Sequence, residues 1–586
     1  MSNQHFDSVV GNLFYGEIEE QNTFPYPSFT PEQKELAKEF INGFNKFAHD
    51  QLDSKKIDDE GEIPPEIYKG LAALGLYGMA VPEEFGGLNL DYSLYCRIFA
   101  QVCEYDGSLA VMLGAHQAIG YKGLLLEGTP EQKKKWLPSL ASGEKLASFC
   151  LTEPGSGSDA YSIKTKATKN ADGTYTITGQ KLWITNAGVA QFYTVFCKTD
   201  HQVDGKNVEK ISALIVEKDM KGVSFGKKED KMGIRGSETR AIFFDKVIVP
   251  AENMLGEPGK GFKLAMNILN NGRLSLGAGC VGGMKTLLNL ASGHAKTRKQ
   301  FDRPISEFAM VQEKLAKMAS HIYSTESIVY MTTGNMGKGM DDFYLETAAC
   351  KIFGSECLWS CVDMGLQIAA GNGYMKEYPY ERIMRDSRIN LIFEGTNEIL
   401  RAFLALSGVQ GPSEGLAELG KISNVSKALQ DPIKSLGVLT DFAKSRFSKI
   451  IGSARLTQHH ESFAEFAKKL SSNVASFSLA VEDSLLKYRE KIVDNELPLK
   501  RISDMAIELY VEIAVISRTT KILNDEKISK DKKDYCTRLA KLSLKESNSR
   551  FRRSLREMSN NSDLLIKQIS DDVTKFEGYG LDIIDF

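Results

Sequence analysis

The sequence predicts a mainly α-helical protein with a central β domain, followed by an extra C-terminal helical domain. Three changes of pattern predict this. Helical periodicity runs to about residue 147, strand-like alternation begins near Phe149, and the helical period returns at Gly261 and continues toward the C-terminus. At 586 residues the chain is too long for one ordinary core, so several structural units are expected.

The first part of the chain is predicted to be helical. Pro31 begins a run with helical periodicity, and Pro64-Pro65 opens another helix at its first turn, where the missing amide hydrogen of proline is not needed. Residues Tyr92 to Leu126 are apolar enough for a pair of core helices. We therefore assign residues 1–30 to an N-terminal extension and residues 31–147 to a helical domain.

Residues 148–256 are predicted to form the β domain. An Asp172-Gly173 turn precedes the alternating positions of Thr174-Tyr-Thr-Ile-Thr, which predicts a hairpin. Further strands are expected at Phe192–Cys197, Ile211–Val216 and Ala241–Val249, and Pro250 ends the strand pattern.

Residues 257–408 form long helical segments with short glycine-containing links, which predicts a helical bundle. Within it, Gly277-Ala-Gly-Cys-Val-Gly282 has the G-x-G-x-x-G spacing of dinucleotide sites. That fingerprint requires a preceding strand and a surrounding βαβ unit, so we interpret these glycines as close helix packing. Residues 408–415 are interpreted as a Gly/Pro linker to the additional helical domain, residues 416–586.

Composition excludes some classes of function. A net charge of −3 and a pI near 6.3 give no electrostatic case for nucleic acid as a partner. The nine cysteines contain no C-x-x-C pair and the histidines no H-x-x-x-H pair, so neither a metal site nor a disulfide framework is expected. The sequence contains no run of about 18 apolar residues, so no membrane span is predicted.

The N-terminal residues carry neither the basic flank of a secretory signal nor the arginines of a transit peptide. We expect a cytoplasmic protein of bacterial type, or a mitochondrial matrix protein if the chain is a processed form.

Two stretches at the helix-to-strand junction are candidates for a cofactor site. Leu151-Thr-Glu-Pro-Gly-Ser-Gly-Ser-Asp159 is either an ordinary turn or a loop whose amides and hydroxyls hold a polar cofactor. Lys181-Leu-Trp-Ile-Thr-Asn186 places Trp183 at the end of a strand. A tryptophan alone is more often part of a core, but the two stretches together favour the cofactor interpretation.

Glu394 is the candidate catalytic residue. It follows Leu391, Ile392 and Phe393, and a carboxyl group among apolar residues is hard to ionise because burial disfavours the charged form. The alternative is an acid at a helix N-terminus, with Thr396 or Glu398 capping, worth about 1 kcal/mol.

In order and spacing, these stretches resemble the acyl-CoA dehydrogenase family of flavoproteins over about residues 30–407. The matching stretches are LTEPGSGSD, KLWITN, MGIRGS, GEPGKGF, RKQF, LQIAAGNGY, YPYERIMRD and IFEGTNEILR. The sequence is most similar to the very-long-chain acyl-CoA dehydrogenase branch, through Asn267–Arg273, Gly114–Gln117, Phe24-Pro-Tyr-Pro and the extra C-terminal helical region.

The resemblance implies bound FAD and a fold of N-terminal α domain, β-barrel-like middle domain and C-terminal four-helix bundle. By position, the residues lining the flavin would be Phe149, Thr152, Gly157, Ser158, Trp183, Ile184 and Thr185, with Thr396, Asn397 and Glu398 closing over it. The residues reaching the FAD of a neighbouring subunit would be Arg298, Gln300, Phe301, Gln367 and Gly371. The sequence departs from the family pattern at Asp302, where a glycine is usual, and at Ala369-Ala370.

The resemblance also implies the reaction. Glu394 would remove the α-proton of an acyl-CoA thioester while the β-hydride passes to flavin N5, and the product would be a trans-2-enoyl-CoA. Residues facing the substrate would be Ser158, Asn270, Arg273 and Gly395. Some family members carry the base on the helix that holds Arg273. The matching position here is Gly272, which favours Glu394 as the base and a straight-chain substrate.

The substrate length and the partners are further expectations. Gly120 and Gly123 share one helix face where this branch has a deep acyl pocket, although tight helix packing explains them equally well. We expect long-chain acyl-CoA, an electron-transfer flavoprotein as acceptor, and a homodimer. The alternatives are an acyl-CoA oxidase that uses oxygen and a scaffold or assembly protein on the same fold. Residues 416–450 look amphipathic, which indicates either peripheral membrane contact or packing on the bundle.

Overall fold

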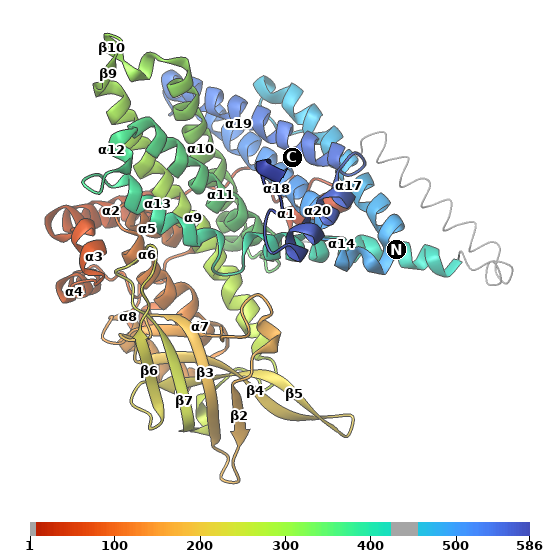
Figure 1. Ribbon diagram of the computed structural model, residues 1–586. Helices are drawn as coiled ribbons and strands as arrows, with labels where there is room; N and C mark the ends of the chain where they lie inside the picture. The colour runs from red at the N-terminus through yellow and green to blue at the C-terminus, as the bar shows by residue number, and fades with distance from the viewer. Residues whose placement is uncertain (1–7, 423–454, 586) are drawn as a thin grey trace. The chain divides into compact units, whose positions relative to one another are not determined.

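The computed structural model describes residues 8–422 and 455–585, and its contacts divide the chain into two units (Figure 1). The larger unit contains Thr23–Leu400 and Ser517–Ser543. The smaller unit contains the described parts of Met1–Asn22, Arg401–Ile516 and Leu544–Phe586. The smaller unit is therefore assembled from segments far apart in the sequence.

The larger unit begins with helices. Thr30 caps α2 (Pro31–Gln51) in a reciprocal capping box with Gln33, and α4 (Pro65–Ala73) starts at the second proline of the predicted pair. The other helices are α3 (Ser54–Glu60), α5 (Tyr92–Cys103), α6 (Gly107–Gly114), the π-helical turn η2 (Ala115–Gly120), α7 (Lys122–Glu127) and α8 (Pro130–Ala141).

The stretch Gly107–Glu127 is long and apolar enough to cross a membrane, with a mean hydropathy of 1.2, and 72% of it is buried inside the protein. It forms α6, η2 and α7, which pack in the core with the adjacent β domain. Sequence inspection for an unbroken apolar run did not detect this stretch. Its burial is that of a core segment.

The middle of the larger unit is an eight-stranded sheet in the order β6-β7-β3-β2-β4-β5-β8, with β1 paired to β4. The strands are β1 (Ala147–Cys150), β2 (Lys166–Lys169), β3 (Tyr175–Thr185), β4 (Phe192–Val203), β5 (Lys206–Glu217), β6 (Val223–Lys228), β7 (Thr239–Val249) and β8 (Met254–Leu255). The predicted hairpin is confirmed as β2–β3, with Gly173 in the left-handed region at φ +91°. The strand pattern missed β1, β6 and β8.

The third part of the larger unit is the helical bundle. Its members are α9 (Gly261–Thr297), α10 (Ala309–Gly337), α11 (Tyr344–Ala369), α12 (Gly371–Tyr374) and α13 (Tyr380–Arg388), and a small β9–β10 ribbon (Lys299–Gln300 and Arg303–Pro304) joins α9 to α10. The glycines of the G-x-G-x-x-G stretch are confirmed as packing positions. A Cβ on Gly282 would lie 2.1 Å from the carbonyl oxygen of Ala100, and one on Gly277 would lie 3.1 Å from that of Cys350.

The smaller unit is helical. Its elements are α1 (Val9–Phe14), α14 (Asn397–Ile422, from Arg401), α17 (Ala464–Tyr488), α18 (Glu496–Asn524, to Ile516), α19 (Lys530–Glu557, from Leu544) and α20 (Asp563–Lys575). The predicted linker at 408–415 is wrong, because α14 continues through it with Pro412 inside the helix. The amphipathic region proposed at 416–450 lies outside the described residues, apart from the end of α14.

The N-terminal helix α1 explains why a glycine stands at position 408. All six residues of α1 are buried, and Phe14 packs edge-on against Phe477 of α17, with ring centroids 5.0 Å apart. A Cβ on Gly408 would lie 2.2 Å from the Phe14 ring. Close approach of an aromatic ring therefore requires this glycine within a continuous helix, and sequence reading mistakes it for a linker residue.

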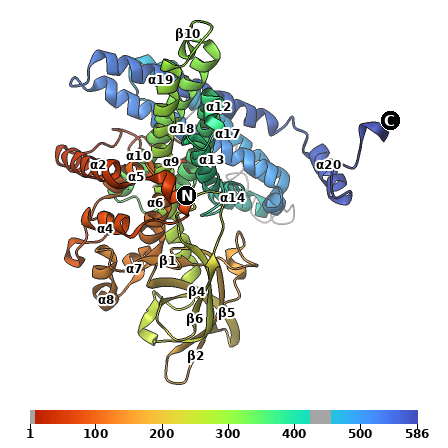
Figure 2. The ribbon, with the colours of Figure 1, turned by 60° about the vertical axis from the view of Figure 1, so that its left-hand side comes forward.

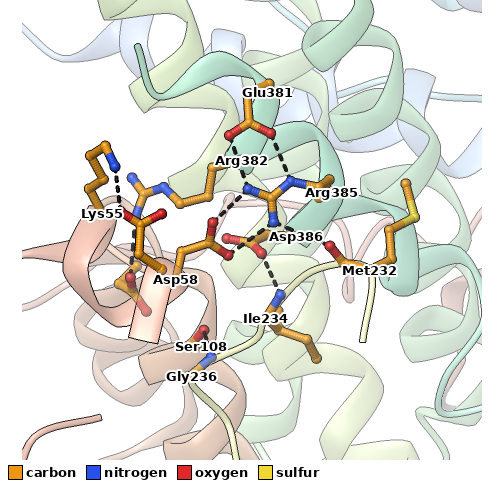
Figure 3. Close-up of polar contacts among 12 residues, drawn as sticks. Lys55, Asp58, Ser108, Met232, Ile234, Gly236, Glu381, Arg382, Arg385 and Asp386 are labelled. Atoms are coloured by element: carbon orange, nitrogen blue, oxygen red, sulfur yellow. Dashed lines mark hydrogen bonds and ion pairs between the residues drawn. The ribbon is translucent and has the colours of Figure 1, made fainter. Parts of the chain in front are cut away.

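One partly buried ionic cluster joins the three parts of the larger unit (Figure 3). The Arg385 guanidinium of α13 makes two hydrogen bonds to Asp58 of α3, at 2.6 and 2.9 Å, and two to Glu381, at 2.7 and 3.0 Å. It also donates to the carbonyl of Met232 in the β domain. The neighbouring Asp386 accepts a hydrogen bond from the amide of Ile234. The MGIRGS and YERIMRD stretches therefore meet in space.

Burial, together with the nearby carboxylate of Asp106, raises the pKa of Asp386 to about 7. In an unfolded chain the pKa would lie near 4. As the pH rises between these values, the unfolded state loses the proton first, so stability falls with increasing pH and remains reduced above pH 7.

We therefore predict that Asp386→Asn stabilises the protein above pH 7 by roughly 2–4 kcal/mol and has little effect near pH 4. Asparagine is neutral in both states and retains an oxygen for the Ile234 amide. Urea denaturation at pH 4.5 and pH 8 measures the difference. The exposed carboxyl Asp59, which pairs with Lys55, provides the control variant Asp59→Asn. Equal effects of Asp386→Asn at the two pH values would contradict the prediction.

Candidate active site

Glu394 lies in a tight loop between the short helix η6 (Ile389–Leu391) and α14. Glu394 has φ +58° and Gly395 has φ +95°, so two consecutive residues adopt the left-handed region. A residue with a side chain rarely adopts this conformation, at a cost of about 1–3 kcal/mol unless its surroundings hold it there. The loop therefore needs a support.

Two buried cations support the loop, one from each of two bundle helices. Arg273 of α9 donates from Nε to the carbonyl oxygen of Glu394 at 3.2 Å. Lys351 of α11 donates from Nζ to the carbonyl oxygen of Gly395 at 2.9 Å and to Oδ1 of Asn397 at 2.7 Å. Both cations are buried. We call this pair the carbonyl clamp, because it binds the successive carbonyl groups of the two left-handed residues.

The carboxyl group of Glu394 is held differently. Its Oε2 is inaccessible to solvent and has no hydrogen-bond partner among the described residues. Burial raises the pKa of Glu394 to about 7, while the positive charges of Arg273 and Lys351 lower it. Burial also lowers the pKa of Lys351 to about 8, and the negative charge of Glu394 opposes this shift. The expectation of a carboxyl group with a raised pKa is confirmed.

The apolar triad before Glu394 is not what buries it, since Ile392 is 46% exposed. The enclosure comes from the bundle and from η2. A Cβ on Gly272 would lie 2.7 and 2.9 Å from the two carboxyl oxygens and 2.8 Å from Cγ2 of Ile119. The glycine at 272 thus makes room for the carboxyl group that the sequence places at 394.

A second buried lysine, Lys181, holds the loop that follows β1, residues 151–159. Lys181 of β3 donates to the carboxylate of Glu153 at 2.7 Å and to the carbonyl of Leu151 at 3.0 Å. The same carboxylate accepts the amides of Lys164 and Thr165. Although burial alone would raise it, the pKa of Glu153 is lowered by the Lys181 charge and by these hydrogen bonds.

The other side of this loop is exposed to solvent. Gly157 and Ser158 are exposed, and an added Cβ on Gly155 or Gly157 would meet nothing within 4 Å. Thr152 and Phe149 are half-buried. The loop is therefore held on its buried side by Lys181 and Glu153 and exposes Gly157 and Ser158 on the other side, which fits residues that hold a polar cofactor such as FAD.

Trp183 lies on an irregular part of β3, where the register with β7 shifts between Lys181 and Ile184. It has φ +57° and is 63% exposed, which is unusual for a tryptophan and leaves a large flat ring without cover. Thr185 is half-buried, whereas the side chain of Ile184 is 3% exposed and belongs to the core. An uncovered aromatic ring beside the open loop supports a flavin site at this place.

The residues predicted to reach a neighbouring subunit lie on the surface. Arg298, Gln300, Phe301, Gln367 and Gly371 are all exposed. Asp302 has φ +62°, which explains why a glycine is usual there, and aspartate is among the residues that tolerate this conformation. Ala370 has φ +52°, where a glycine would be unstrained. The role of these residues at a second subunit stays a prediction.

The remaining predicted residues divide into two groups. Glu398 is exposed and Thr396 half-buried. The side chain of Asn397 is buried and bonded to Lys351, Ser355 and Glu356, which leaves only its backbone for a cofactor. The side chain of Asn397 therefore holds the loop, and the closing of these three residues over the cofactor stays a prediction.

On the substrate side, Asn270 accepts a hydrogen bond from Arg273 at 2.7 Å. Gly120 and Gly123 are buried, and an added Cβ would meet Ala115 and Ala147 in one case and Ile268 and Leu255 in the other. Close packing accounts for both glycines, and their part in an acyl pocket stays a prediction.

Lys351 is the site residue that sequence reading missed. It is the one Lys or Arg in the sequence of α11, on a helix that is otherwise mostly apolar and small. A single cation within a helix of that composition is a usable signal, because burial of lysine requires partners. Within the described residues, no group of three or more metal-binding side chains occurs.

Comparison with known proteins identifies the family. Models of the N-terminal, middle and C-terminal domains of acyl-CoA dehydrogenases match residues 30–144, 148–247 and 259–408, and a model of the ACAD9/ACADV C-terminal domain matches residues 461–579. The chain belongs to the acyl-CoA dehydrogenase family. It is an FAD flavoprotein oxidoreductase, as the resemblance implied, with the additional helical domain of the very-long-chain branch.

Three relatives illustrate the match. The very long-chain specific acyl-CoA dehydrogenase of Bos taurus is 42% identical over 88% of this chain and 79% of its own length. An acyl-CoA dehydrogenase complexed with FAD from Bacillus anthracis is 33% identical, with a TM-score of 0.79 over 96% of this chain and 94% of that one. Butyryl-CoA dehydrogenase of Megasphaera elsdenii is 36% identical, with a TM-score of 0.61 over 66% of this chain and all (100%) of that one.

The carbonyl clamp predicts the effect of removing its lysine. In Lys351→Met, the charge that lowers the pKa of Glu394 is lost, so kcat/KM should rise with pH through a midpoint roughly 1 unit higher. The loosened loop should also lower kcat by about tenfold or more. Steady-state rates with an acyl-CoA substrate between pH 5.5 and 9 measure both effects.

Two variants control this experiment. Lys351→Arg keeps the charge, so its pH midpoint should stay near that of the unchanged protein. Arg518→Met removes a partly buried cation of the larger unit, one that binds Glu326 and the carbonyl of Tyr323, and should lower stability without moving the midpoint. An unshifted midpoint in Lys351→Met would show that the lysine has no electrostatic effect on the base.

Proposed function

We propose that this acyl-CoA dehydrogenase oxidises long-chain acyl-CoA thioesters to trans-2-enoyl-CoA in fatty acid β-oxidation, with Glu394 as the base that removes the α-proton. The observation that carries the proposal is the carboxyl group of Glu394, unpartnered at Oε2, with a pKa raised to about 7. A general base is most effective when its pKa lies near the working pH, because it is then both deprotonated and sufficiently basic.

The geometry around Glu394 supports this role. Gly395 leaves the backbone beside the base without a side chain, so that a thioester can approach closely. In the proposed mechanism the backbone amide of Glu394, in its fixed left-handed conformation, donates to the thioester carbonyl and stabilises the charge that develops on it. Bound FAD supplies the acceptor for the β-hydride.

Substrate length is proposed from the chain's organisation. The butyryl-CoA dehydrogenase covers 66% of this chain, whereas the very long-chain specific relative covers 88%, including the additional helical domain. Gly272 leaves the base at position 394, which favours straight acyl chains. We further propose an electron-transfer flavoprotein as the acceptor, a homodimer as the assembly, and a cytoplasmic location.

The base assignment is tested with Glu394→Gln, which keeps the size of the side chain and removes its basicity. We expect the variant to bind FAD normally but to show no bleaching of the flavin by acyl-CoA under anaerobic conditions, a loss of at least about 10³-fold in rate. Glu512 is another buried glutamate whose pKa burial raises, to about 8, and it lies in the smaller unit. Glu512→Gln should bleach normally. Bleaching of Glu394→Gln at the ordinary rate would exclude Glu394 as the base.

Chain length and acceptor are tested with the unchanged protein. Anaerobic bleaching by straight-chain acyl-CoAs from C4 to C18 should be fastest between C12 and C18, and a maximum at C4–C8 would exclude the long-chain proposal. The reduced flavin is then mixed with either an electron-transfer flavoprotein or oxygen. Rapid reoxidation by oxygen alone would favour the oxidase alternative.

A further inference from the structure

The C-terminal residues of the described chain form an apolar surface without cover. We call residues 563–585 the C-terminal arm; it comprises α20, the segment that follows it, and the short helix Ile583–Asp585. No residue of α20 is buried. Figure 2 shows the arm projecting clear of α17 and α18 of the same unit.

Most apolar residues of α20 occupy one side of the helix. Ile566, Ile569, Val573 and Phe576 follow at intervals of three or four residues, which places them in one stripe. The large apolar side chains of the arm are between 45% and 86% exposed; they are Leu564, Leu565, Ile566, Ile569, Val573, Phe576, Tyr579, Leu581, Ile583 and Ile584. Together they offer on the order of 1,000 Å² of surface, comparable with the roughly 800 Å² that each partner buries in a standard protein interface.

An ionic contact attaches the arm at its base. Arg501 of α18, which is buried, makes two hydrogen bonds to the carboxylate of Asp563, at 2.5 and 2.7 Å. Its Nε also lies 3.8 Å from the carboxylate of Glu557 at the end of α19. A helix of this length is only marginally stable alone in water. A firmly anchored amphipathic helix with an exposed apolar stripe is therefore suited to docking on a separate molecule.

The net negative charge of the C-terminal arm indicates which kind of molecule it can dock on. Between Asp563 and Asp585 the arm has six acidic residues and two lysines. Helices that lie on membranes carry Lys and Arg on the polar side, because lipid surfaces are often anionic, so an acidic arm is poorly suited to a bilayer. A basic protein surface with apolar side chains nearby is the matching chemistry.

The chain itself carries such a surface. The stretch from Lys545 to Arg556 of α19 has five basic residues and one acidic residue, and Lys545, Arg552, Arg553 and Arg556 are exposed. The charge of Lys487 acts on Asp563, which places the end of α17 near the base of the arm, and there Leu486 and Val493 are 49% and 55% exposed. We call this combination the basic face. It is close to the base of the arm along the chain, and the Arg501 contacts hold the end of α19 and the start of α20 together.

We propose that the C-terminal arm of one copy of this chain docks onto the basic face of a second copy, and that the two copies exchange arms. A two-fold symmetric interface requires complementary surfaces on the same subunit, and the acidic apolar arm and the basic face provide them. The inference rests on the homodimer proposed above and names the element that holds it together.

Cross-linking of the full FAD-loaded chain tests which molecule the arm touches. Ile569 is replaced by the photo-reactive residue benzoylphenylalanine, and protein with natural nitrogen is mixed with an equal amount of ¹⁵N-labelled protein. Exchanged arms should give cross-links to peptides containing residues 486–493 or 545–556, about half of them joining one labelled and one unlabelled chain. Cross-links confined to single chains would overturn the proposal.

Sedimentation of matched variants tests whether the arm holds the dimer. Ile566→Asp with Ile569→Asp places two charges on the apolar stripe and should weaken dimerisation at least about tenfold. Gln568→Asp with Thr574→Asp adds the same charge on the opposite side and should change it within about twofold. Because no residue of α20 is buried, both variants should keep their FAD absorbance and fold.

A charge exchange separates specific docking from general disruption. Arg552→Glu with Arg553→Glu should weaken the dimer, and adding Asp571→Lys with Asp572→Lys should restore it. If the apolar-stripe variant dimerises as tightly as the unchanged chain, the arm proposal is wrong and the dimer stands. If the unchanged chain is a monomer at micromolar concentration, both are wrong, while dehydrogenase activity remains a separate measurement. Arm-dependent flotation with lipid vesicles in place of dimerisation would assign the arm to a membrane.

Discussion

The left-handed loop at Glu394 and Gly395, held by two cations that bind its carbonyl groups, is the constraint on which the site depends. A catalytic carboxyl group must be buried enough to be basic, yet a direct salt bridge would lower its pKa and remove that basicity. Arg273 and Lys351 satisfy both conditions, because they donate to the backbone of the loop and act on the carboxyl group only through space. The pKa therefore lies near 7, between the value of an exposed glutamate and that of a fully isolated one.

The β domain uses the same residue types for the opposite purpose. Lys181 bonds directly to the carboxylate of Glu153, and two backbone amides complete the shell, so this carboxyl group stays ionised although it is buried. The pair fixes the loop that is proposed to face the flavin. The difference between the proposed base and this structural glutamate thus lies in whether the cation reaches the carboxylate or only the carbonyl groups beside it.

Sequence patterns predicted the order of helical and β regions, because strand alternation and proline-initiated helices are local properties. Motifs specific to the family also drew attention to Glu394 and Gly272, which the structure brings together, while the two predicted cofactor loops stay a prediction. They could not show that Lys351 supports the loop, since that contact joins residues 44 positions apart. The continuity of α14 was missed for a similar reason: Gly408 is read locally as a helix breaker, but Phe14, distant in sequence, is what requires a glycine there.

The same contact between Phe14 and Gly408 has a consequence for how the protein is made. The helix α1 buries all six of its residues in a unit whose other segments begin about 400 residues later in the sequence, so a ribosome makes α1 long before them. Until those segments emerge, its apolar side chains have no native partner. The smaller unit can close only after residues beyond Leu544 have been synthesised. Nascent α1 is consequently a segment that chaperones would be expected to bind throughout elongation.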